Sequence, residues 1–169
     1  MDNTTTIIVM LILVTMSAFF SATETAFSSL SLTKIKISAE QGNKKSALIL
    51  KLLDDYDTLL STILVGNNIV NIGLSSIATV WFVELIGSGG ATVSTAVITI
   101  TVLIFGEITP KSLAKESPES FASFSAPIIN FIRIILTPVN WLFSQWKKLI
   151  SKMFKSKDDR TLTEEELLS

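Results

Sequence analysis

The 169-residue sequence contains no cysteine and no histidine. Their absence excludes disulfide bonds, thiol chemistry, a histidine general base and the soft-metal sites that these side chains build. A metal ion bound by this chain would therefore be a hard cation held by oxygen atoms. The sequence also shows no nucleophile paired with a base, and we expect the chain not to be an enzyme.

Charge is scarce as well: charged residues make up 17% of the chain, against 48% hydrophobic residues. This composition is too apolar for a soluble domain of this size and is typical of an integral membrane protein. All fourteen basic residues fall in two blocks, Lys34–Lys51 and Lys111–Arg160. By the positive-inside rule both blocks are cytoplasmic. We therefore expect a multi-pass protein of the cell (plasma) membrane, with its N-terminus outside and its C-terminus in the cytoplasm.

Three long stretches carry little or no charge, and each is long enough to cross a bilayer core of about 30 Å. We expect spans at about residues 6–32, 58–83 and 91–110, with a cytoplasmic helical segment at 33–57. The glycines at Gly87–Gly90 predict a short external turn between the second and third spans. The predicted fold class is an all-α membrane protein, with a three-span transmembrane core in residues 1–117 and short cytoplasmic helices.

Residues 118–155 are amphipathic and carry a basic cluster near two tryptophans, at Lys147 and Lys148. A fourth crossing would place this cluster outside, against the charge rule, so we expect an amphipathic juxtamembrane belt helix along the inner interface. Residues 156–169 form a charged tail that resembles the start of a further helix.

The most informative stretch is Phe105-Gly106-Glu107-Ile108-Thr109-Pro110-Lys111 at the inner end of the third span. A carboxylate buried in a membrane is costly unless it has a partner. Pro110 has no N–H to donate to the carbonyl four residues before it, which leaves the Gly106 carbonyl free to bind elsewhere. Two oxygens at a helix break inside a membrane suit a cation. The alternative is an ordinary helix end at which Glu107 pairs with Lys111.

Two further polar patches lie in the other spans. Ser21, Thr25 and Ser28 share one helical face beside Glu24, and three asparagines occur in Gly66-Asn67-Asn68-Ile69-Val70-Asn71. Each patch has a plain structural alternative: the hydroxyls bond back to their own helix, and the amides join neighbouring helices. Otherwise these groups surround the Glu107 carboxylate with neutral oxygens, an environment that suits octahedral Mg²⁺.

The motifs Phe20–Ala26, Gly66–Asn71 and Phe105–Lys111, in this order and at these spacings, resemble those of the CorC/CNNM magnesium transporter family. The likeness covers the whole chain as that family's transmembrane domain. It implies a homodimer in the lipid bilayer that holds a partly or fully dehydrated Mg²⁺ in an inward-facing cavity between the three helices. It also implies Mg²⁺ export, with Na⁺ as a coupling ion, and a pair of cytoplasmic CBS domains that follow this domain in full-length members. Nucleic acid is not an expected partner.

The resemblance also implies a ligand set. Ser21 corresponds to the serine of the first motif, and Glu107 to the glutamate of the third, with Gly106 contributing its carbonyl. Asn71, with Asn67 as second choice, corresponds to the asparagines of the second motif. Any contribution of Thr25 would come from the backbone, and Pro110 would supply a structural kink.

Two functions stay open at this stage. The first is a secondary transporter that exports Mg²⁺ by alternating access. The alternative is a membrane-embedded Mg²⁺ sensor or scaffold that signals to cytoplasmic domains without transporting the ion.

Overall fold

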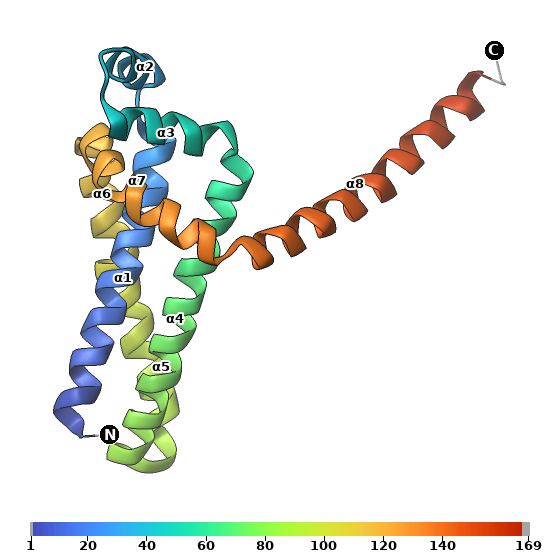
Figure 1. The fold of residues 1–169 in the computed structure, drawn as a ribbon. Coiled ribbons are helices and arrows are strands. Elements are labelled where there is room, and N and C mark those ends of the chain that lie inside the picture. The colour runs from blue at the N-terminus through green and yellow to red at the C-terminus, as the bar shows by residue number, and fades with distance from the viewer. Residues whose placement is uncertain (1, 167–169) are drawn as a thin grey trace. The chain divides into compact units, whose positions relative to one another are not determined.

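The computed structural model describes the backbone of residues 2–166 and the side chains of residues 2–152, which form helices joined by short links (Figure 1). In chain order they are α1 (Asn3–Ser29), α2 (Leu32–Glu40), α3 (Lys44–Asp54), α4 (Tyr56–Ile86), the 3₁₀ turn η1 (Gly87–Gly89), α5 (Gly90–Thr101), the π-helix η2 (Val102–Ile108), α6 (Thr109–Glu116), α7 (Pro118–Ile135) and α8 (Thr137–Glu166). Residues 2–166 contain no β-strand, and the predicted all-α membrane fold is confirmed.

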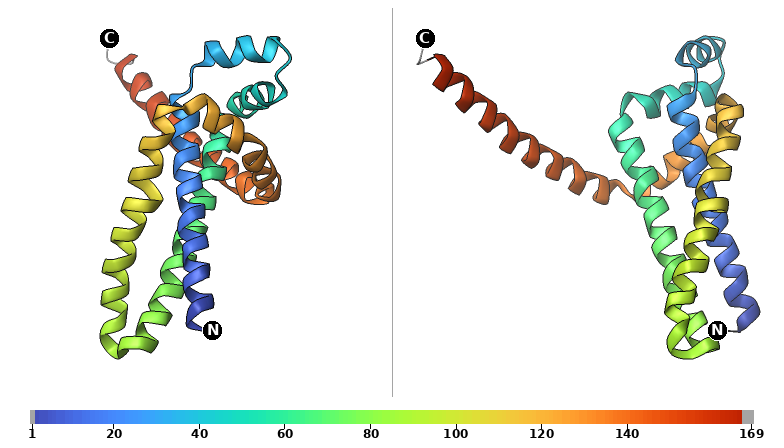
Figure 2. Two further views of the ribbon diagram at one scale, coloured as in Figure 1. Left: turned by 90° about the vertical axis from the view of Figure 1, so that its left-hand side faces the viewer. Right: turned by 180° about the vertical axis from the view of Figure 1, so that it is seen from behind.

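Two described stretches are long and apolar enough to cross a membrane, Asn3–Ser29 and the 61-residue run Tyr56–Glu116. A straight helix of the second length would extend about 90 Å, three times the bilayer core. Instead the run folds back at η1, where Gly87 has φ +78°, and α4 packs against α5 (Figure 2). The chain therefore makes three passes: α1, α4 and the continuous rod α5–η2–α6.

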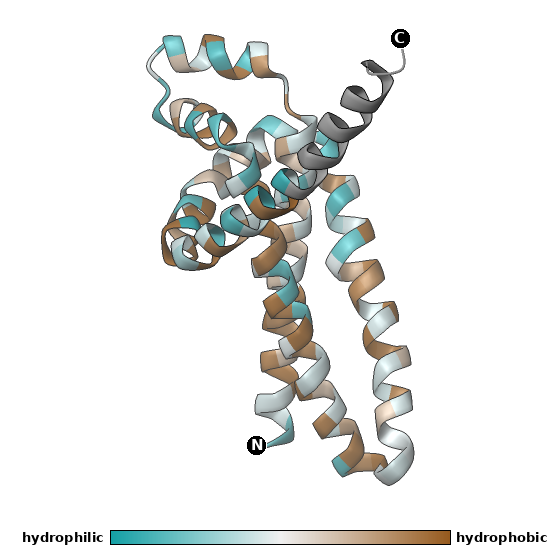
Figure 3. Cartoon of the chain, turned by 90° about the vertical axis from the view of Figure 1, so that its right-hand side faces the viewer, coloured by the Kyte–Doolittle hydropathy of each residue, from teal (hydrophilic) through white to brown (hydrophobic). Residues whose placement is uncertain are grey.

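The three passes lie side by side, with the N-terminus and the η1 turn at one end and α2 and α3 at the other (Figures 1 and 2). Hydrophobic residues dominate the crossing segments, whereas hydrophilic residues are frequent in α2 and α3 (Figure 3). Large apolar side chains such as Leu11, Ile72 and Ile100 point away from the bundle and are 62%, 67% and 59% exposed. This outward apolar surface is what a bilayer would cover.

Two predicted boundaries differ from the structure. The first span ends at Ser29 instead of Leu32, because Leu30 is extended (ψ 152°) and Leu32 already begins α2. The predicted helix break at Pro110 is wrong. The backbone widens into η2, where the Thr109 N–H donates to the Ile104 carbonyl five residues back, and the helix then continues to Glu116. A π-helical turn accommodates a missing N–H without stopping the helix.

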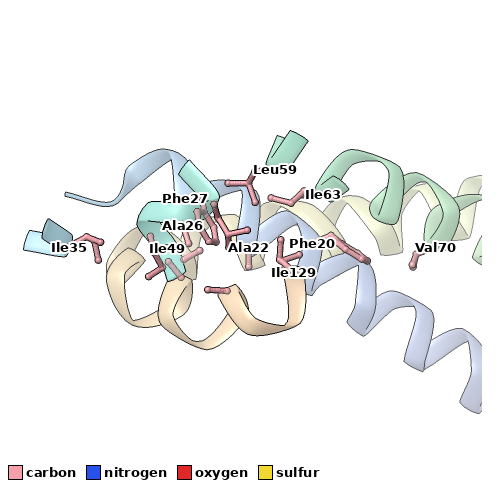
Figure 4. Close-up of a cluster of buried hydrophobic side chains, with 14 residues drawn as sticks. Phe20, Ala22, Ala26, Phe27, Ile35, Ile49, Leu59, Ile63, Val70 and Ile129 are labelled. Atoms are coloured by element: carbon pink, nitrogen blue, oxygen red, sulfur yellow. The ribbon is translucent and has the colours of Figure 1, made fainter. Parts of the chain in front are cut away.

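The half of the bundle next to α2 and α3, called the inner half, is built around α1. Its residues from Phe20 to Phe27 are buried, with only Glu24 partly exposed. Helices α2, α3, α4, α6 and α7 all contribute to the surrounding apolar cluster (Figure 4). Its buried members are Phe20, Ala22, Ala26, Phe27, Ile35, Ile49, Leu52, Leu59, Ile63, Val70, Ala114, Ala122, Ala126 and Ile129.

The half next to the η1 turn, called the outer half, holds a much smaller apolar cluster. Its buried members are Leu74, Ala78 and Ile98. Partly buried side chains of α1, α4 and η2 pack against it, among them Leu13 and Val102. The two clusters leave a polar layer between them at the level of Ser17 on α1.

Helix α7 is joined to the bundle by packing and by charge. Its buried face consists of Ala122, Ser125, Ala126 and Ile129. At its first turn, Glu119 Oε1 accepts a hydrogen bond from the Ser31 N–H (3.3 Å) and lies 3.5 Å from Lys34 Nζ. The carboxylate therefore ties the start of α7 to the link between α1 and α2.

The predicted belt of residues 118–155 consists of two helices, α7 and α8, separated at Leu136. The chain divides into two compact units, residues 1–133 and 134–169, and α8 is the helix of the second unit. The helix start expected in the tail is present as far as Glu166, and Leu167 and Leu168 lie outside the described residues. A position along the inner interface stays a prediction.

The packing of α4 on α1 predicts a contrast between two glycines of α4. A Cβ at Gly66 would collide with the tip of the Phe20 ring, which is 3% exposed, whereas a Cβ at Gly73 would meet nothing within 4 Å. We expect Gly66→Ala to lower the free energy of unfolding by about 1–3 kcal/mol through overpacking. Gly73→Ala, the matched control, should be neutral or stabilising by up to about 1 kcal/mol. Thermal unfolding in detergent measures both, and equal effects would contradict this packing.

The Glu119 contacts predict a pH dependence of stability. Hydrogen bonds from the backbone N–H groups of Glu119 and Ser31, aided by the Lys34 charge, hold the pKa of Glu119 below its ordinary value of 4.5. A carboxyl whose folded pKa is lowered stabilises the fold fully above its unfolded pKa and loses this effect as the pH falls through the folded pKa.

We therefore expect Glu119→Gln to destabilise the protein at pH 6 by less than about 1 kcal/mol, since the pair is partly exposed. The difference from wild type should shrink as the pH falls below 4.5 and vanish once the pH has passed below the lowered pKa of Glu119. Exposed Glu40 gives the control, Glu40→Gln. A Glu119→Gln effect that persists unchanged at pH 3 would show that the carboxylate charge is not the cause.

Candidate cation site

The polar layer is centred on Asn67. The Ser17 hydroxyl of α1 donates to Asn67 Oδ1 over 3.1 Å, and the Asn71 side-chain amide donates to the same oxygen over 3.3 Å. Ser17 is completely buried. These contacts lie near the middle of α1 and α4. Asn67 therefore joins two helices, as the structural alternative for the asparagines predicted.

The backbone of η2 reaches the same layer at Gly106. This residue is buried, and a Cβ on it would lie 2.9 Å from Ser17 Oγ. Only glycine lets the π-helical backbone come this close to α1. Pro110, also buried, offers no N–H to the Gly106 carbonyl. The layer thus combines one group from each pass: the Ser17 hydroxyl of α1, the Asn67 amide of α4 and the Gly106 backbone of η2.

Two buried oxygens of this region lack a hydrogen-bond partner among the described residues. They are Ser21 Oγ and Asn71 Oδ1. Ser21 lies one turn inward of Ser17 on α1 and is 1% exposed. A buried polar atom left unpaired costs about 1–3 kcal/mol, so such atoms call for a ligand or water. Both oxygens belong to residues that the motifs singled out as ligands.

Glu107 is partly exposed and makes no hydrogen bond or ion pair with residues 2–152. The expected alternative, a pair between Glu107 and Lys111, does not form. Lys111 Nζ instead lies 3.4 Å from Glu24 Oε2 on α1. The Glu24–Lys111 ion pair therefore joins α1 to α6. It lies about one helical turn closer to α2 and α3 than Ser21 and Glu107 do. The Glu107 charge is left available for a cation.

Other predicted residues stand apart from this layer. Thr25 is buried, and its carbonyl accepts the Ser28 hydroxyl over 3.1 Å. Ser28 thus bonds back to its own helix, as the structural alternative for the hydroxyls predicted. Asn68 is exposed on α4. Neither Thr25 nor Asn68 has a contact that links it to Ser17 or Gly106.

Sequence reasoning missed Ser17. It precedes Ser21 by four residues and so lies on the same face of α1, inside a run that is otherwise mostly apolar. That spacing could have extended the polar face of α1 outward by one turn. The spacing alone does not single Ser17 out, because a single serine in a transmembrane helix is usually bonded to its own backbone.

The candidate ligands are all oxygen atoms, and only one of them carries a charge. The described residues contain no group of three or more acidic, histidine or cysteine side chains that could hold a metal. The candidates are one carboxylate, Glu107, and three neutral oxygens, from Ser21, Asn71 and the Gly106 backbone. Such a set can bind a hard cation weakly and reversibly.

A family model described as the cyclin M (CNNM) transmembrane N-terminal domain matches residues 7–169. A UPF0053 protein of Haemophilus influenzae is 38% identical over 168 residues, which cover 98% of this chain and 40% of the relative. The UPF0053 inner membrane protein YfjD of Escherichia coli is 35% identical over 155 residues, covering 89% of this chain and 36% of that protein. A chloroplastic DUF21 domain-containing protein of Arabidopsis thaliana is 30% identical over 95% of the chain and 25% of its own length.

The chain thus spans at most about two fifths of the length of these relatives. The family match extends over all three passes and includes Ser21, Asn71, Gly106 and Glu107. The chain belongs to the CNNM transmembrane-domain family of membrane proteins.

Proposed function

We propose that this domain binds Mg²⁺ from the cytoplasmic side and exports it across the plasma membrane by alternating access. The observation that carries the proposal is the Glu107 carboxylate, which makes no ion pair with residues 2–152 and directly follows the buried Gly106 backbone at a π-helical turn. Ser21 Oγ on α1 and Asn71 Oδ1 on α4 are buried and have no hydrogen-bond partner among the described residues, and we propose them as two further ligands.

The donor types favour Mg²⁺ over softer metals. Carboxylate, amide, hydroxyl and carbonyl oxygens are hard ligands, and Mg²⁺ prefers six of them in octahedral geometry. With one carboxylate among the candidates, the occupied site would keep a net positive charge. Binding would then be modest, which allows the ion to leave on the other side. Mn²⁺ and Co²⁺ share this ligand chemistry and belong in the same binding assays.

The way the passes pack supports access from the cytoplasm. In the inner half, η2 and α6 pack mainly on α1, while α4 packs on α1 and α3. Helix α1 therefore packs against both α4 and α6 in the inner half. The partial exposure of Glu107 agrees with a site that opens inward between them.

The π-helical turn η2 supports a conformational change of the third pass during transport. Such turns are often found at functional sites, because a single extra residue per turn leaves carbonyls without their usual donors. Gly106 carries no side chain that would resist a change of backbone register. A shift of η2 between π and α geometry would move the Gly106 carbonyl and Glu107 together, which is one route to alternating access.

Several elements of the proposal come from the family resemblance. Na⁺ is proposed as the coupling ion, and the working unit is proposed to be a homodimer in the lipid bilayer. In the full-length chain a cytoplasmic CBS pair is the proposed regulatory partner.

Mg²⁺ binding to the purified protein can be measured by isothermal calorimetry. Glu107→Gln removes the carboxylate charge with little change of shape, and we expect Mg²⁺ affinity to fall at least about tenfold, or about 1.4 kcal/mol. The matched control is Glu116→Gln, an exposed carboxylate on the same rod. A second pair compares Asn71→Ala, which should weaken binding, with Asn68→Ala, which should not. Equal Mg²⁺ binding in wild type and Glu107→Gln would remove this site from consideration.

A sensor that does not transport is the second candidate. Two sets of contacts favour it, because they connect the site to the proposed cytoplasmic segments. Glu24 pairs with Lys111 one turn from the site. Farther along, Glu119 contacts Ser31 and Lys34 at the start of α2. A bound cation could act through these contacts on domains that follow the chain.

Flux separates the two functions. In liposomes that hold a Mg²⁺-sensitive dye, a transporter should show Mg²⁺ movement that Glu107→Gln abolishes and Glu116→Gln leaves intact. A Na⁺ gradient across the same membrane tests coupling. Calorimetric binding together with no wild-type flux, with or without the gradient, would establish the sensor and refute the exporter.

A further inference from the structure

A cavity of about 300 Å³ lies between α4 and the α5–η2 part of the third pass. Five hydroxyl side chains and one amide contribute to its lining: Ser75, Thr79, Ser94, Thr95, Thr99 and Asn71. Apart from Asn71, these residues all lie closer to the η1 turn than the polar layer does. The cavity is therefore on the opposite side of Asn71 from Ser21 and Glu107.

A plain structural reading of the hydroxyls exists. Thr79 and Thr95 donate back to their own helices, to the carbonyls of Ser75 (2.8 Å) and Ala91 (2.9 Å). Such hydroxyls let two transmembrane helices pack closely without any ligand. A close seam would, however, leave no space between α4 and α5.

Two observations favour a hydrated space instead. The volume has room for several waters, each of which takes about 30 Å³ in the liquid. Ile98, Val102 and Leu103 make part of the lining apolar, but its hydroxyl and amide groups give such waters hydrogen-bond partners. The lining also includes Asn71, whose Oδ1 is buried without a hydrogen-bond partner among the described residues. The back-bonded hydroxyls still have lone pairs that can accept from water.

We propose that this cavity is the outer half of the cation path and that a hydrated metal cation passes through it after leaving Glu107. The inference rests on the proposed transport function. None of the lining residues is charged. A site without a carboxylate cannot replace the inner water shell of Mg²⁺, which that ion gives up reluctantly. Hydroxyl and amide groups can instead hydrogen-bond to the waters the ion carries, and Asn71 would serve both halves of the path.

The outer end of the cavity is narrow. Thr79 Oγ1 and Ser94 Oγ lie 3.5 Å apart across α4 and α5, and Ser94 is only 1% exposed. This contact would have to open for an ion to leave, while the Asn71 end is already connected to the polar layer.

The chain has no cysteine, which makes single-cysteine labelling free of background. In liposomes, Ser75→Cys and Thr99→Cys are exposed to a cationic, membrane-impermeant thiosulfonate applied from the outer side. The reagent reaches the cavity in the molecules whose Thr79–Ser94 contact has opened. The control is Ile100→Cys, next to Thr99 but on an apolar, 59% exposed surface that faces away from the bundle. Because the thiolate is the reactive form and needs water, the two cavity positions should react at least about tenfold faster than position 100. Labelling of Ser75→Cys and Thr99→Cys no faster than that of Ile100→Cys would overturn the proposal.

A second variant tests the role of the cavity in transport. The double substitution Ser75→Ala with Thr99→Val removes two of the six polar side chains of the lining at nearly constant volume. Fewer polar partners should reduce the hydration of the cavity. We expect Mg²⁺ flux to fall at least about tenfold while the calorimetric Mg²⁺ affinity stays at the wild-type value. Unchanged flux would refute the outer path. Mg²⁺ binding by Glu107→Gln tests the Glu107 site alone. Cysteine labelling tests the outer cavity and needs no flux. Failure of the proposed Glu107 site can therefore be distinguished from failure of the proposed outer path.

Discussion

The structure depends on polar contacts made where lipid offers no alternative partner. Between transmembrane helices the hydrophobic effect gives little specificity, and hydrogen bonds and close backbone approach set the register. The Ser17–Asn67 bond joins α1 to α4 in mid-membrane, and Trp81 Nε1 donates to Asn3 Oδ1 (3.0 Å) at the outer end. The two contacts are fourteen residues apart on each helix, as expected for helices packed antiparallel in register. Gly106 then brings the third pass against the same serine.

This arrangement concentrates unfavourable groups in one place. A carboxylate and two buried oxygens without partners among the described residues, together with a proline-disturbed backbone, each cost stability. Elsewhere the described chain avoids such costs, as when Glu24 pairs with Lys111 and Ser28 bonds to its own helix. Strained or unsatisfied groups that cluster are typical of functional sites, where a ligand completes them.

The two halves of the bundle are built differently. The inner half surrounds α1 with five other helices and a large apolar cluster, whereas the outer half has three buried apolar residues and a hydroxyl-lined cavity. Dense packing resists deformation, and loosely packed helices can separate at lower cost. A conformational change would therefore move α4 and α5 at the outer end more readily than α1 at the inner end.

The sequence by itself determined the number of passes, the η1 turn and the most unusual carboxylate, because hydropathy, Gly87 and Glu107 are local features that a bilayer constrains strongly. Which side chains meet was decided only by the tertiary structure. The sequence offered Lys111 a partner four residues away, yet Lys111 pairs with Glu24 because α6 packs on α1. Ser17 acquired its role only by facing Asn67 and Gly106. Pro110 removed one hydrogen bond in either case, but whether the helix stopped or widened into a π turn depended on the packing that held both of its ends.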